Sequence, residues 1–265
     1  MAESWLKEQA QAQGWAKATR LEGRPTKQGL VAVAVDSAGR HGSMVEVNCE
    51  TDFVARNKSF QAMVEGVAAA CLKYIEGAPT STISPFTKMH LDADQLKQLP
   101  SVGGSTLADE VALTINNIGE NVVLRRAVGL KTKASESDGL FLTGYVHPTP
   151  SQTNSPVAIP LLGRYGSLVM LKGGADRQKE EIFGKQLCQH IVGMNPLKIG
   201  SEEDKPAKDP DDEKVLILQE YLLDPSTTVG PLLTSNSVSI LDFVRYECGE
   251  ETLQDTENIV AEAVN

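Results

Sequence analysis

The sequence predicts an α+β protein made of two similarly built halves, each a small antiparallel sheet with packed helices. Two alternating apolar stretches followed by a helical pattern occur at 30–75, and the same order returns at 140–194. A further helical segment precedes both halves. The expected divisions are an N-terminal helix at 1–23, a first half at 24–138 and a second half at 139–265.

The N-terminal helix is expected at 3–21, where apolar residues recur near one helical face. Gly23, followed closely by Pro25, predicts where the helix ends. Gly14 weakens this helix by about 1 kcal/mol relative to alanine. This apolar face consists of Trp5, Ala12, Trp15 and Ala16.

A hairpin and a long helix are predicted next. The stretches 29–35 and 43–49 flank a turn-rich segment, and the second stretch alternates in polarity, which is typical of two antiparallel strands. Past Thr51, which can cap a helix, apolar residues recur at helical spacing. One long amphipathic helix is therefore expected, with an inward stripe of Phe53, Phe60, Val64, Val67, Cys71 and Ile75.

The segment 77–100 contains three prolines and is expected to be an irregular connection. Thr106 and Asp109 form a capping-box-like start of a helix that Gly119 ends. Further strands are expected at 121–130, 139–147, 167–172 and 238–248. Further helices are expected at 176–194, at 215–223 and at the C-terminus, the first with Phe183, Leu187, Ile191 and Met194 inward.

Three charged or polar residues need a place in this scheme. Arg125 and Arg126 are adjacent in a strand and should face opposite sides, so one of them can be buried, and that one should be paired. His190 lies near the apolar face of its helix and is interpreted as a partly buried structural histidine.

The composition is that of an ordinary globular protein. Of the 265 residues, 41% are hydrophobic and 23% are charged, which excludes disordered, collagenous and disulfide-rich classes. The 25 basic and 35 acidic residues give a net charge of −10, which disfavours nucleic-acid binding because phosphate backbones are repelled. No stretch approaches the roughly 18 unbroken apolar residues of a membrane helix, so no membrane contact is expected.

Residues that could hold a metal ion or a nucleotide are scattered. The four cysteines and four histidines show no ligand spacing, and Cys49 and Cys71 fit apolar periodicities as core residues. The glycines form no phosphate-binding loop, and the sequence lacks H-E-x-x-H and G-x-S-x-G motifs. We therefore expect no cofactor, no metal, no direct nucleotide binding and no covalent catalysis.

The most informative segment is VEVNCETDFVARN at 45–57, where a predicted strand passes into a helix. The first helical turn carries an acid and a large aromatic side chain together. Periodicity alone favours a structural interpretation. In it, the negative charge of Asp52 interacts favourably with the positive end of the helix dipole, and Phe53 is the first core residue of the apolar stripe.

This segment resembles the signature of elongation factor Ts, the guanine nucleotide exchange factor of elongation factor Tu. The resemblance covers about residues 3–250, and the segment QHIVGMNPLKIG at 189–200 is similar to the mitochondrial branch in particular. The other motifs that carry it are IGENVVLRR at 118–126, GYVH at 144–147, YLLDPSTTVG at 221–230 and DFVRYECGE at 242–250.

The resemblance implies which residues contact a partner. In the family, the residues that match Asp52 and Phe53 push between two helices of the G domain of elongation factor Tu and disturb its magnesium and phosphate contacts. His147 matches a family histidine that also contacts the G domain, and its alternative role is that of an ordinary strand-end residue. Arg56 and Asn57, one turn after Phe53, are expected to border the interface.

Two departures from the family pattern concern length. Bacterial members carry a helical-hairpin insertion for which 200–214 is too short, and this agrees with the mitochondrial branch. The family's N-terminal ubiquitin-associated-like module should precede the core, so the helix at 3–21 is expected to be the last piece of a truncated module. The resemblance implies localisation in the mitochondrial matrix, although the chain as given carries no transit peptide.

The resemblance therefore implies a translation elongation factor that catalyses GDP release from elongation factor Tu. The competing function is a stoichiometric holder or chaperone of elongation factor Tu, in which the shortened N-terminus has removed the affinity needed for efficient turnover.

Overall fold

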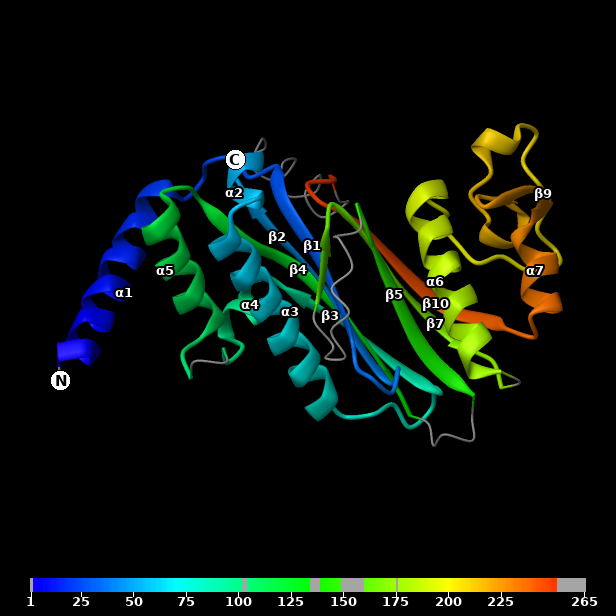
Figure 1. Ribbon diagram of the computed structural model, residues 1–265, viewed down its shortest axis with the longest axis horizontal. Helices are drawn as coiled ribbons and strands as arrows, with labels where there is room; N and C mark the ends of the chain where they lie inside the picture. Colours follow the sequence, from blue (N-terminus) through cyan, green and yellow to red (C-terminus); the bar gives the residue numbers. More distant parts are fainter. Residues whose placement is uncertain (1, 102–103, 134–138, 149–159, 175, 252–265) are drawn as a thin grey trace, which may run out of the picture.

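The structure is a computed structural model that describes residues 2–101, 104–133, 139–148, 160–174 and 176–251, with side chains from residue 9 on (Figure 1). The predicted C-terminal helix and the side chain of Trp5 lie outside the described part. The helices are α1 (Ala2–Leu21), α2 (Asp52–Ala55), α3 (Lys58–Gly77), α4 (Ala93–Gln98), α5 (Leu107–Ile118), α6 (Arg177–Met194) and α7 (Val229–Ser235), with 3-10 turns at Pro210–Asp212 and Leu216–Leu218.

The described strands form two larger sheets and one small hairpin. They are β1 (Gln28–Val35), β2 (His41–Cys49), β3 (Phe86–Asp92), β4 (Val122–Thr132), β5 (Leu140–His147), β6 (Leu161–Gly163), β7 (Tyr165–Lys172), β8 (Glu220–Tyr221), β9 (Asp224–Thr228) and β10 (Ser239–Glu247). The five-stranded sheet has the order β3-β4-β2-β1-β6, the three-stranded sheet has the order β10-β7-β5, and β8 pairs with β9. All these pairs are antiparallel.

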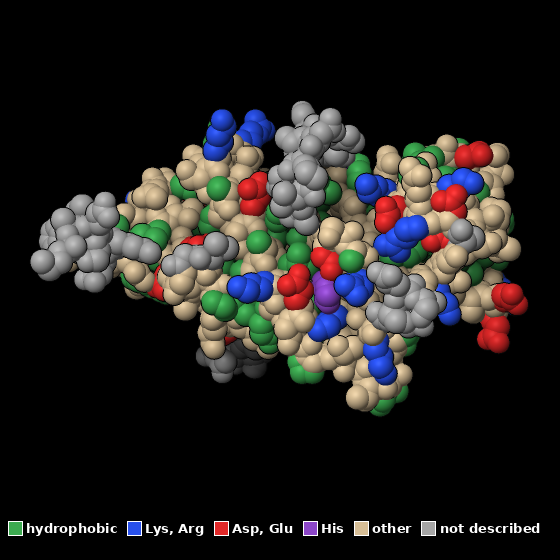
Figure 2. All heavy atoms as spheres, turned by 60° about the horizontal axis from the view of Figure 1, so that its bottom comes forward, with side chains coloured by type: hydrophobic (Ala, Val, Ile, Leu, Met, Phe, Trp, Pro, Cys, Tyr) green, Lys and Arg blue, Asp and Glu red, His purple; other side chains and the backbone are tan. Residues whose placement is uncertain are grey.

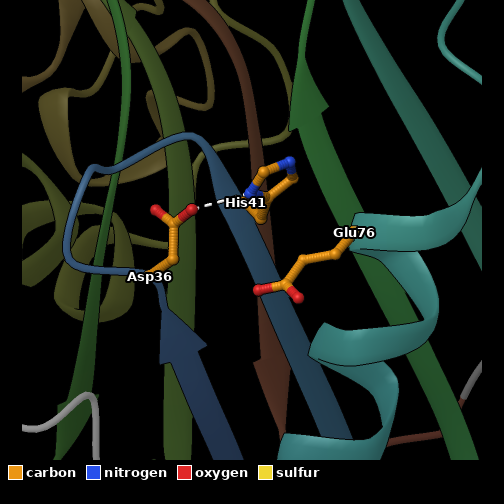
Figure 3. Close-up of side chains that lie close together, drawn as sticks. All are labelled: Asp36, His41 and Glu76. Carbon is orange, nitrogen blue, oxygen red and sulfur yellow. Dashed lines mark hydrogen bonds and ion pairs between the residues drawn. The ribbon is translucent and has the colours of Figure 1, made fainter.

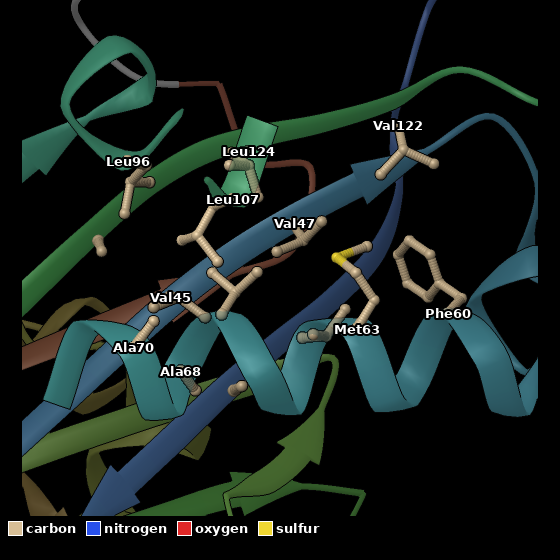
Figure 4. Close-up of a cluster of buried hydrophobic side chains, with 14 of the residues drawn as sticks. Val45, Val47, Phe60, Met63, Ala68, Ala70, Leu96, Leu107, Val122 and Leu124 are labelled. Atoms are coloured by element: carbon tan, nitrogen blue, oxygen red, sulfur yellow. The ribbon is translucent and has the colours of Figure 1, made fainter. Parts of the chain in front are cut away.

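The two sheets lie side by side with helices on their outer faces, so the predicted α+β class is confirmed (Figure 1). One hydrophobic core lies between the five-stranded sheet and α3 (Figure 4), a second lies under α6, and a third joins the two sheets. Cys49 and Cys71 are buried in the first core as predicted, and burial raises the pKa of each thiol to about 12. The division at 138 and 139 stays a prediction.

Other predicted elements are confirmed as well. α5 begins with the capping box of Thr106 and Asp109 and ends at Gly119, which takes a left-handed φ of 87°. α6 ends at Asn195, which also lies in the left-handed region. Met194 is partly buried, and the rest of the predicted inward face of α6 is buried at Phe183, Leu187 and Ile191.

The long helix predicted after Thr51 is wrong in one respect, because the chain forms two helices there. Arg56 ends α2, and α3 begins after Asn57. The side-chain oxygen of Asn57 accepts a hydrogen bond from the backbone N–H of Ser59 at 2.8 Å, which is how an N-cap starts a helix. Periodicity detects the apolar stripe of α3 but not this cap.

The connection predicted to be irregular at 77–100 contains β3 and α4, so that prediction is wrong. β3 is an edge strand with mostly half-exposed or exposed side chains, and it lacks a clear apolar alternation. α4 starts with a capping box, in which Asp92 and Gln95 each accept the backbone N–H of the other. The helix predicted at 215–223 is also wrong, because that segment forms a 3-10 turn and β8, and α7 follows unpredicted.

α1 packs against α5 at Gly14 rather than through the apolar residues of its other face. Gly14 and Leu21 are buried, and a Cβ atom at Gly14 would lie 2.4 Å from the carbonyl oxygen of Ala112 in α5. The contact face therefore follows the smallest residue, because it allows close approach of the two helices. The apolar face is exposed at Ala12, Trp15 and Ala16.

The close approach at Gly14 gives a prediction in which two effects have opposite signs. Helix propensity alone would make Gly14→Ala stabilising by about 1 kcal/mol. The collision with the Ala112 carbonyl should outweigh this, because overpacking typically destabilises by about 1–3 kcal/mol. We expect net destabilisation and loosening of α1. Both tryptophans of the chain lie in α1, so urea unfolding followed by tryptophan fluorescence checks this, with Gly77→Ala as the control in open space.

The prediction that Arg125 and Arg126 face opposite sides of β4 is wrong. The ladder pairs Glu46 of β2 with Arg126, and the register then shifts, so that Arg125 is the extra residue of a β-bulge. Both guanidinium groups consequently reach the same carboxylate. Arg125 Nη1 lies 3.0 Å and Arg126 Nε lies 2.7 Å from the oxygens of Glu46.

This carboxylate ties the segment after β10 to the five-stranded sheet. Glu46 is fully buried, and it also accepts the amide of Asn48 at 3.1 Å and the backbone N–H of Gly249 at 2.7 Å. Arg126 Nη2 in turn lies 2.6 Å from Glu250 Oε1. We call this cluster the Glu46 network, and its charged members are Glu46, Arg125, Arg126 and Glu250.

His190 is structural as predicted, but it is fully rather than partly buried. Its Nε2 lies 3.0 Å from Gln219 Oε1, and its Nδ1 lies 3.1 Å from the backbone nitrogen of Leu222. Because Nδ1 accepts the N–H of Leu222, the ring is neutral and carries its proton on Nε2. Burial lowers the pKa of His190 accordingly.

The lowered pKa of His190 predicts a pH dependence of stability. Below about pH 6.5, the ordinary pKa of histidine, the unfolded chain binds a proton at this position that the folded chain resists. As the pH is lowered from about 6.5, the free energy of unfolding should therefore decrease until the folded ring is also protonated. This residue contributes a slope of at most about 1.4 kcal/mol per pH unit. Urea midpoints at pH 7.5 and 5.5 should differ less for His190→Gln than for the parent. His147→Gln, at an exposed position, is the control for the loss of a histidine.

Candidate partner-binding site

The acid-aromatic corner, which we define as Asp52 and Phe53, lies in the first turn of α2 directly after β2. Thr51 caps this turn, and its hydroxyl oxygen accepts the backbone N–H of Val54 at 3.4 Å. Val54 and Ala55 are buried in the first core and anchor the turn from below. Phe53 is 78% exposed, so its interpretation as a core residue is wrong.

The two predicted neighbours of the corner lie on the same exposed turn. Arg56 Nη2 lies 2.9 Å from Asp52 Oδ2, and both side chains are largely exposed. Pairs of this kind contribute about 0.3–0.5 kcal/mol, so the Asp52 carboxylate can leave Arg56 for another donor at little cost. Asn57 is exposed as well, but its side-chain oxygen is already engaged as the cap of α3.

His147 is the last residue of β5 and is exposed. Its Nδ1 lies 3.2 Å from the hydroxyl oxygen of Tyr145, and its ring centroid lies 6.5 Å from that of Tyr165. Two tyrosines therefore flank the imidazole and orient it, while its outer side faces solvent.

The strand registers place His147 at the same end of the sheets as the corner. Cys49, the last residue of β2, pairs with Gln28, and Arg164 donates to the Gln28 side chain at 2.7 Å. The backbone N–H of Arg164 also donates to the carbonyl of His147 at 2.8 Å. The corner and His147 consequently lie at the same end of the two sheets, where α2 follows β2 at the top of Figure 1.

Behind the corner, two glutamates hold the end of β2 against the start of β4. The Glu120 carboxylate accepts the backbone N–H of Thr51 at 3.0 Å and its hydroxyl at 2.7 Å. Glu50 accepts the backbone N–H of Asn121 at 2.7 Å. Sequence reasoning missed this arrangement, although Glu120 follows the helix-ending Gly119 within the motif IGENVVLRR. We call the four residues Glu50, Thr51, Glu120 and Asn121 the glutamate brace.

A groove of about 310 Å³ lies beside the glutamate brace, between α1, α4, α5 and the start of β4. Its lining is mostly apolar, and Lys97 is the one basic residue among the residues that line it. Phosphate groups are bound by several N–H or cationic donors together, so this groove does not fit a nucleotide. The expected lack of direct nucleotide binding stays a prediction.

Comparison with known proteins identifies the family. The model of the family "Elongation factor TS" matches residues 50–209, which include the corner and His147. A mitochondrial elongation factor Ts from Aedes aegypti is 48% identical over 261 residues, which cover 98% of this chain and 82% of the relative. The chain belongs to the elongation factor Ts family. Mitochondrial elongation factors Ts from Drosophila melanogaster and Homo sapiens are 44% and 40% identical, covering 98% and 97% of this chain and 79% and 76% of theirs.

Membership of the elongation factor Ts family implies a nucleotide exchange role in translation elongation, with elongation factor Tu as the partner. Exchange of this kind needs no covalent catalysis. The relatives are named mitochondrial, which supports a mitochondrial localisation of this chain. Among the described helices, none is long and apolar enough to cross a bilayer.

One group of described side chains outside this elongation factor Ts site has the makeup of a metal site. Asp36, His41 and Glu76 lie together at the far end of the β1–β2 hairpin (Figure 3). His41 Nδ1 and Asp36 Oδ2 lie 2.6 Å apart and bond to each other, and Lys131 Nζ donates to the backbone carbonyl of Glu76 at 2.7 Å. The Asp36 carboxylate thus already has His41 as its partner, and Lys131 contacts the backbone of Glu76 rather than its carboxylate.

Charges of both signs are also mixed over the face that Figure 2 shows, where Lys and Arg lie among Asp and Glu around a histidine. This face presents no broad basic surface of the kind that binds nucleic acids. The expected lack of metal and nucleic-acid binding stays a prediction.

Proposed function

We propose that the chain accelerates GDP release from elongation factor Tu by inserting the acid-aromatic corner into the G domain of that protein. The exposure of Phe53 carries this proposal. A phenylalanine that is 78% exposed on an anchored turn leaves a large apolar surface in water, which binding to a partner would remove. Phenylalanine has two side-chain torsions to freeze, so this burial loses little conformational entropy.

The other site residues take supporting roles in this proposal. Asp52 turns from Arg56 to polar groups of the partner helix, and Arg56 and Asn57 contact the rim of the interface. His147, at the same end of the sheets, makes a second contact with the G domain. Contacts at the rim of an interface contribute little individually, so the corner supplies most of the specific binding energy.

Nucleotide release follows from thermodynamic linkage. If binding of the chain lowers the affinity of elongation factor Tu for GDP, then GDP lowers the affinity for the chain by the same factor. The chain therefore binds the nucleotide-poor form most tightly, and incoming GTP displaces it. The elongation factor Ts chain itself needs no nucleotide site.

The test is release of a fluorescent GDP analogue from elongation factor Tu in the presence of excess unlabelled nucleotide. A true exchange factor turns over, so one equivalent of the chain should release GDP from many equivalents of elongation factor Tu. If release instead stops at one equivalent of elongation factor Tu per chain, the proposal fails, and a stoichiometric holder of elongation factor Tu is supported.

A further inference from the structure

We propose that Glu120 is a positioning residue for Phe53, which acts through the glutamate brace without touching the partner. The inference rests on the proposed insertion of Phe53. It adds a residue from the start of β4 that sets the direction in which the corner points.

The contacts of Glu120 converge on the residue that begins the corner. Its two carboxylate oxygens accept the N–H and the hydroxyl of Thr51, so a single side chain fixes both the backbone and the rotamer of Thr51. The same hydroxyl then accepts the N–H of Val54 inside α2. These bonds thereby fix the orientation of the turn that carries Phe53 relative to the start of β4.

On the side that faces β4, side-chain hydrogen bonds hold the start of α2 where the strand ladder has ended. The β2–β4 ladder ends at the pair of Cys49 and Val122, and the following residues are joined by side-chain bonds to the backbone of the opposite strand. α2 has four residues, and a single turn is not stable by itself. Its direction therefore depends on its anchors, which include the buried pair Val54 and Ala55, the glutamate brace, and two further bonds: from Cys49 Sγ to the carbonyl of Thr51 at 3.2 Å and from the Gln61 amide to the carbonyl of Ala55 at 3.4 Å.

Backbone and side-chain hydrogen bonds fix the two residues next to Glu120 in the sequence. Glu120 follows Gly119, whose left-handed conformation ends α5 and whose N–H bonds to the carbonyl of Ile115 at 2.9 Å. Asn121 bonds to Glu50 and also donates from its side chain to the carbonyl of Arg24 at 3.2 Å. A preorganised corner loses less entropy when it binds, so the brace should favour productive insertion.

A double-mutant cycle distinguishes positioning of Phe53 from a separate role of Glu120. The maximal rate of GDP release is measured for the parent, Glu120→Ala, Phe53→Ala and the double variant at saturating concentrations. We expect Glu120→Ala to lower the rate about fivefold in the parent and to change it less than about 1.5-fold when Phe53 is absent, because coupled residues are non-additive. Equal fold losses in both backgrounds would overturn the inference.

Further variants separate this inference from the proposed function and from unfolding. Glu120→Gln keeps an oxygen for the Thr51 hydroxyl but presents an amide donor to the Thr51 N–H, so its loss should be intermediate. Thr51→Ser keeps both bonds and should retain the parent rate. Thr51→Val keeps the backbone N–H bond to Glu120 but loses the hydroxyl that links Glu120 to the N–H of Val54, so it should lower the rate. The exposed Glu76→Ala is the control for loss of one negative charge.

The outcomes distinguish the two proposals. If Phe53→Ala itself exchanges normally, the proposed function fails. If Phe53→Ala is impaired but Thr51→Val and Glu120→Gln are not, the positioning role alone fails.

Discussion

Phe53→Ala is expected to lower the maximal rate of GDP release from elongation factor Tu by at least about tenfold, because truncating a central aromatic anchor typically costs about 2 kcal/mol or more. The folded chain should keep its stability, since Phe53 is 78% exposed and packs little within it. Stopped-flow release of a fluorescent GDP analogue measures the rate, and urea unfolding measures the stability.

Two further variants make this result specific. Phe53→Leu keeps an apolar side chain and should retain part of the activity, and Asp52→Asn should lose less than Phe53→Ala because its free-state pair with Arg56 is exposed. Ile83→Ala removes another exposed apolar side chain, which is 97% accessible, away from α2 and should exchange normally. Normal exchange by a folded Phe53→Ala would rule out insertion of the corner.

Glu46→Gln is expected to destabilise the chain by about 3–5 kcal/mol, the usual effect of removing one partner from a buried ion pair. The substitution keeps the shape of the side chain but turns an amide group toward the guanidinium groups of Arg125 and Arg126. Because Glu46 also holds the backbone N–H of Gly249, the segment after β10 should detach early. Urea unfolding and hydrogen exchange at Gly249 measure the two effects.

An exposed pair supplies the matched control for Glu46. Asp94 Oδ1 lies 3.0 Å from Lys97 Nζ, and both side chains are exposed, so Asp94→Asn should change stability by less than about 1 kcal/mol. If Glu46→Gln falls in the same small range, the Glu46 network does not join the C-terminal segment to the sheet in the way its geometry indicates.

The fold class and most helices and strands could be predicted because the apolar periodicity and the capping residues of these segments agree with the way the segments pack. The hairpin alternates around a turn-rich segment, and α5 carries its start and its stop in Thr106 and Gly119. β3 escaped prediction because an edge strand with few buried side chains has little apolar alternation to detect. The contact face of α1 could not be read from its large apolar residues, because Gly14 decides how closely α1 and α5 can approach.

In the candidate site, too, the features that could not be predicted depend on caps, bulges and contacts between residues far apart in the sequence. Periodicity assigned Phe53 to the stripe of α3, but the cap at Asn57 starts a new helix and leaves Phe53 outside that stripe. Arg125 and Arg126 meet at Glu46 because of a β-bulge, and single-sequence alternation cannot locate an extra residue in a ladder. The glutamate brace joins residues about 70 positions apart in sequence, so local patterns carry no trace of it.

The short strand β6 has a consequence for solubility. Without a neighbour, β1 would present the backbone of an apolar edge strand to other molecules, and exposed strand edges of this kind template intermolecular pairing. Leu161, Leu162 and Gly163 pair with Val33, Ala32 and Val31 and occupy that edge. Three residues of β6 thereby cover a stretch of backbone that could otherwise pair with a second molecule in a fibril-like way.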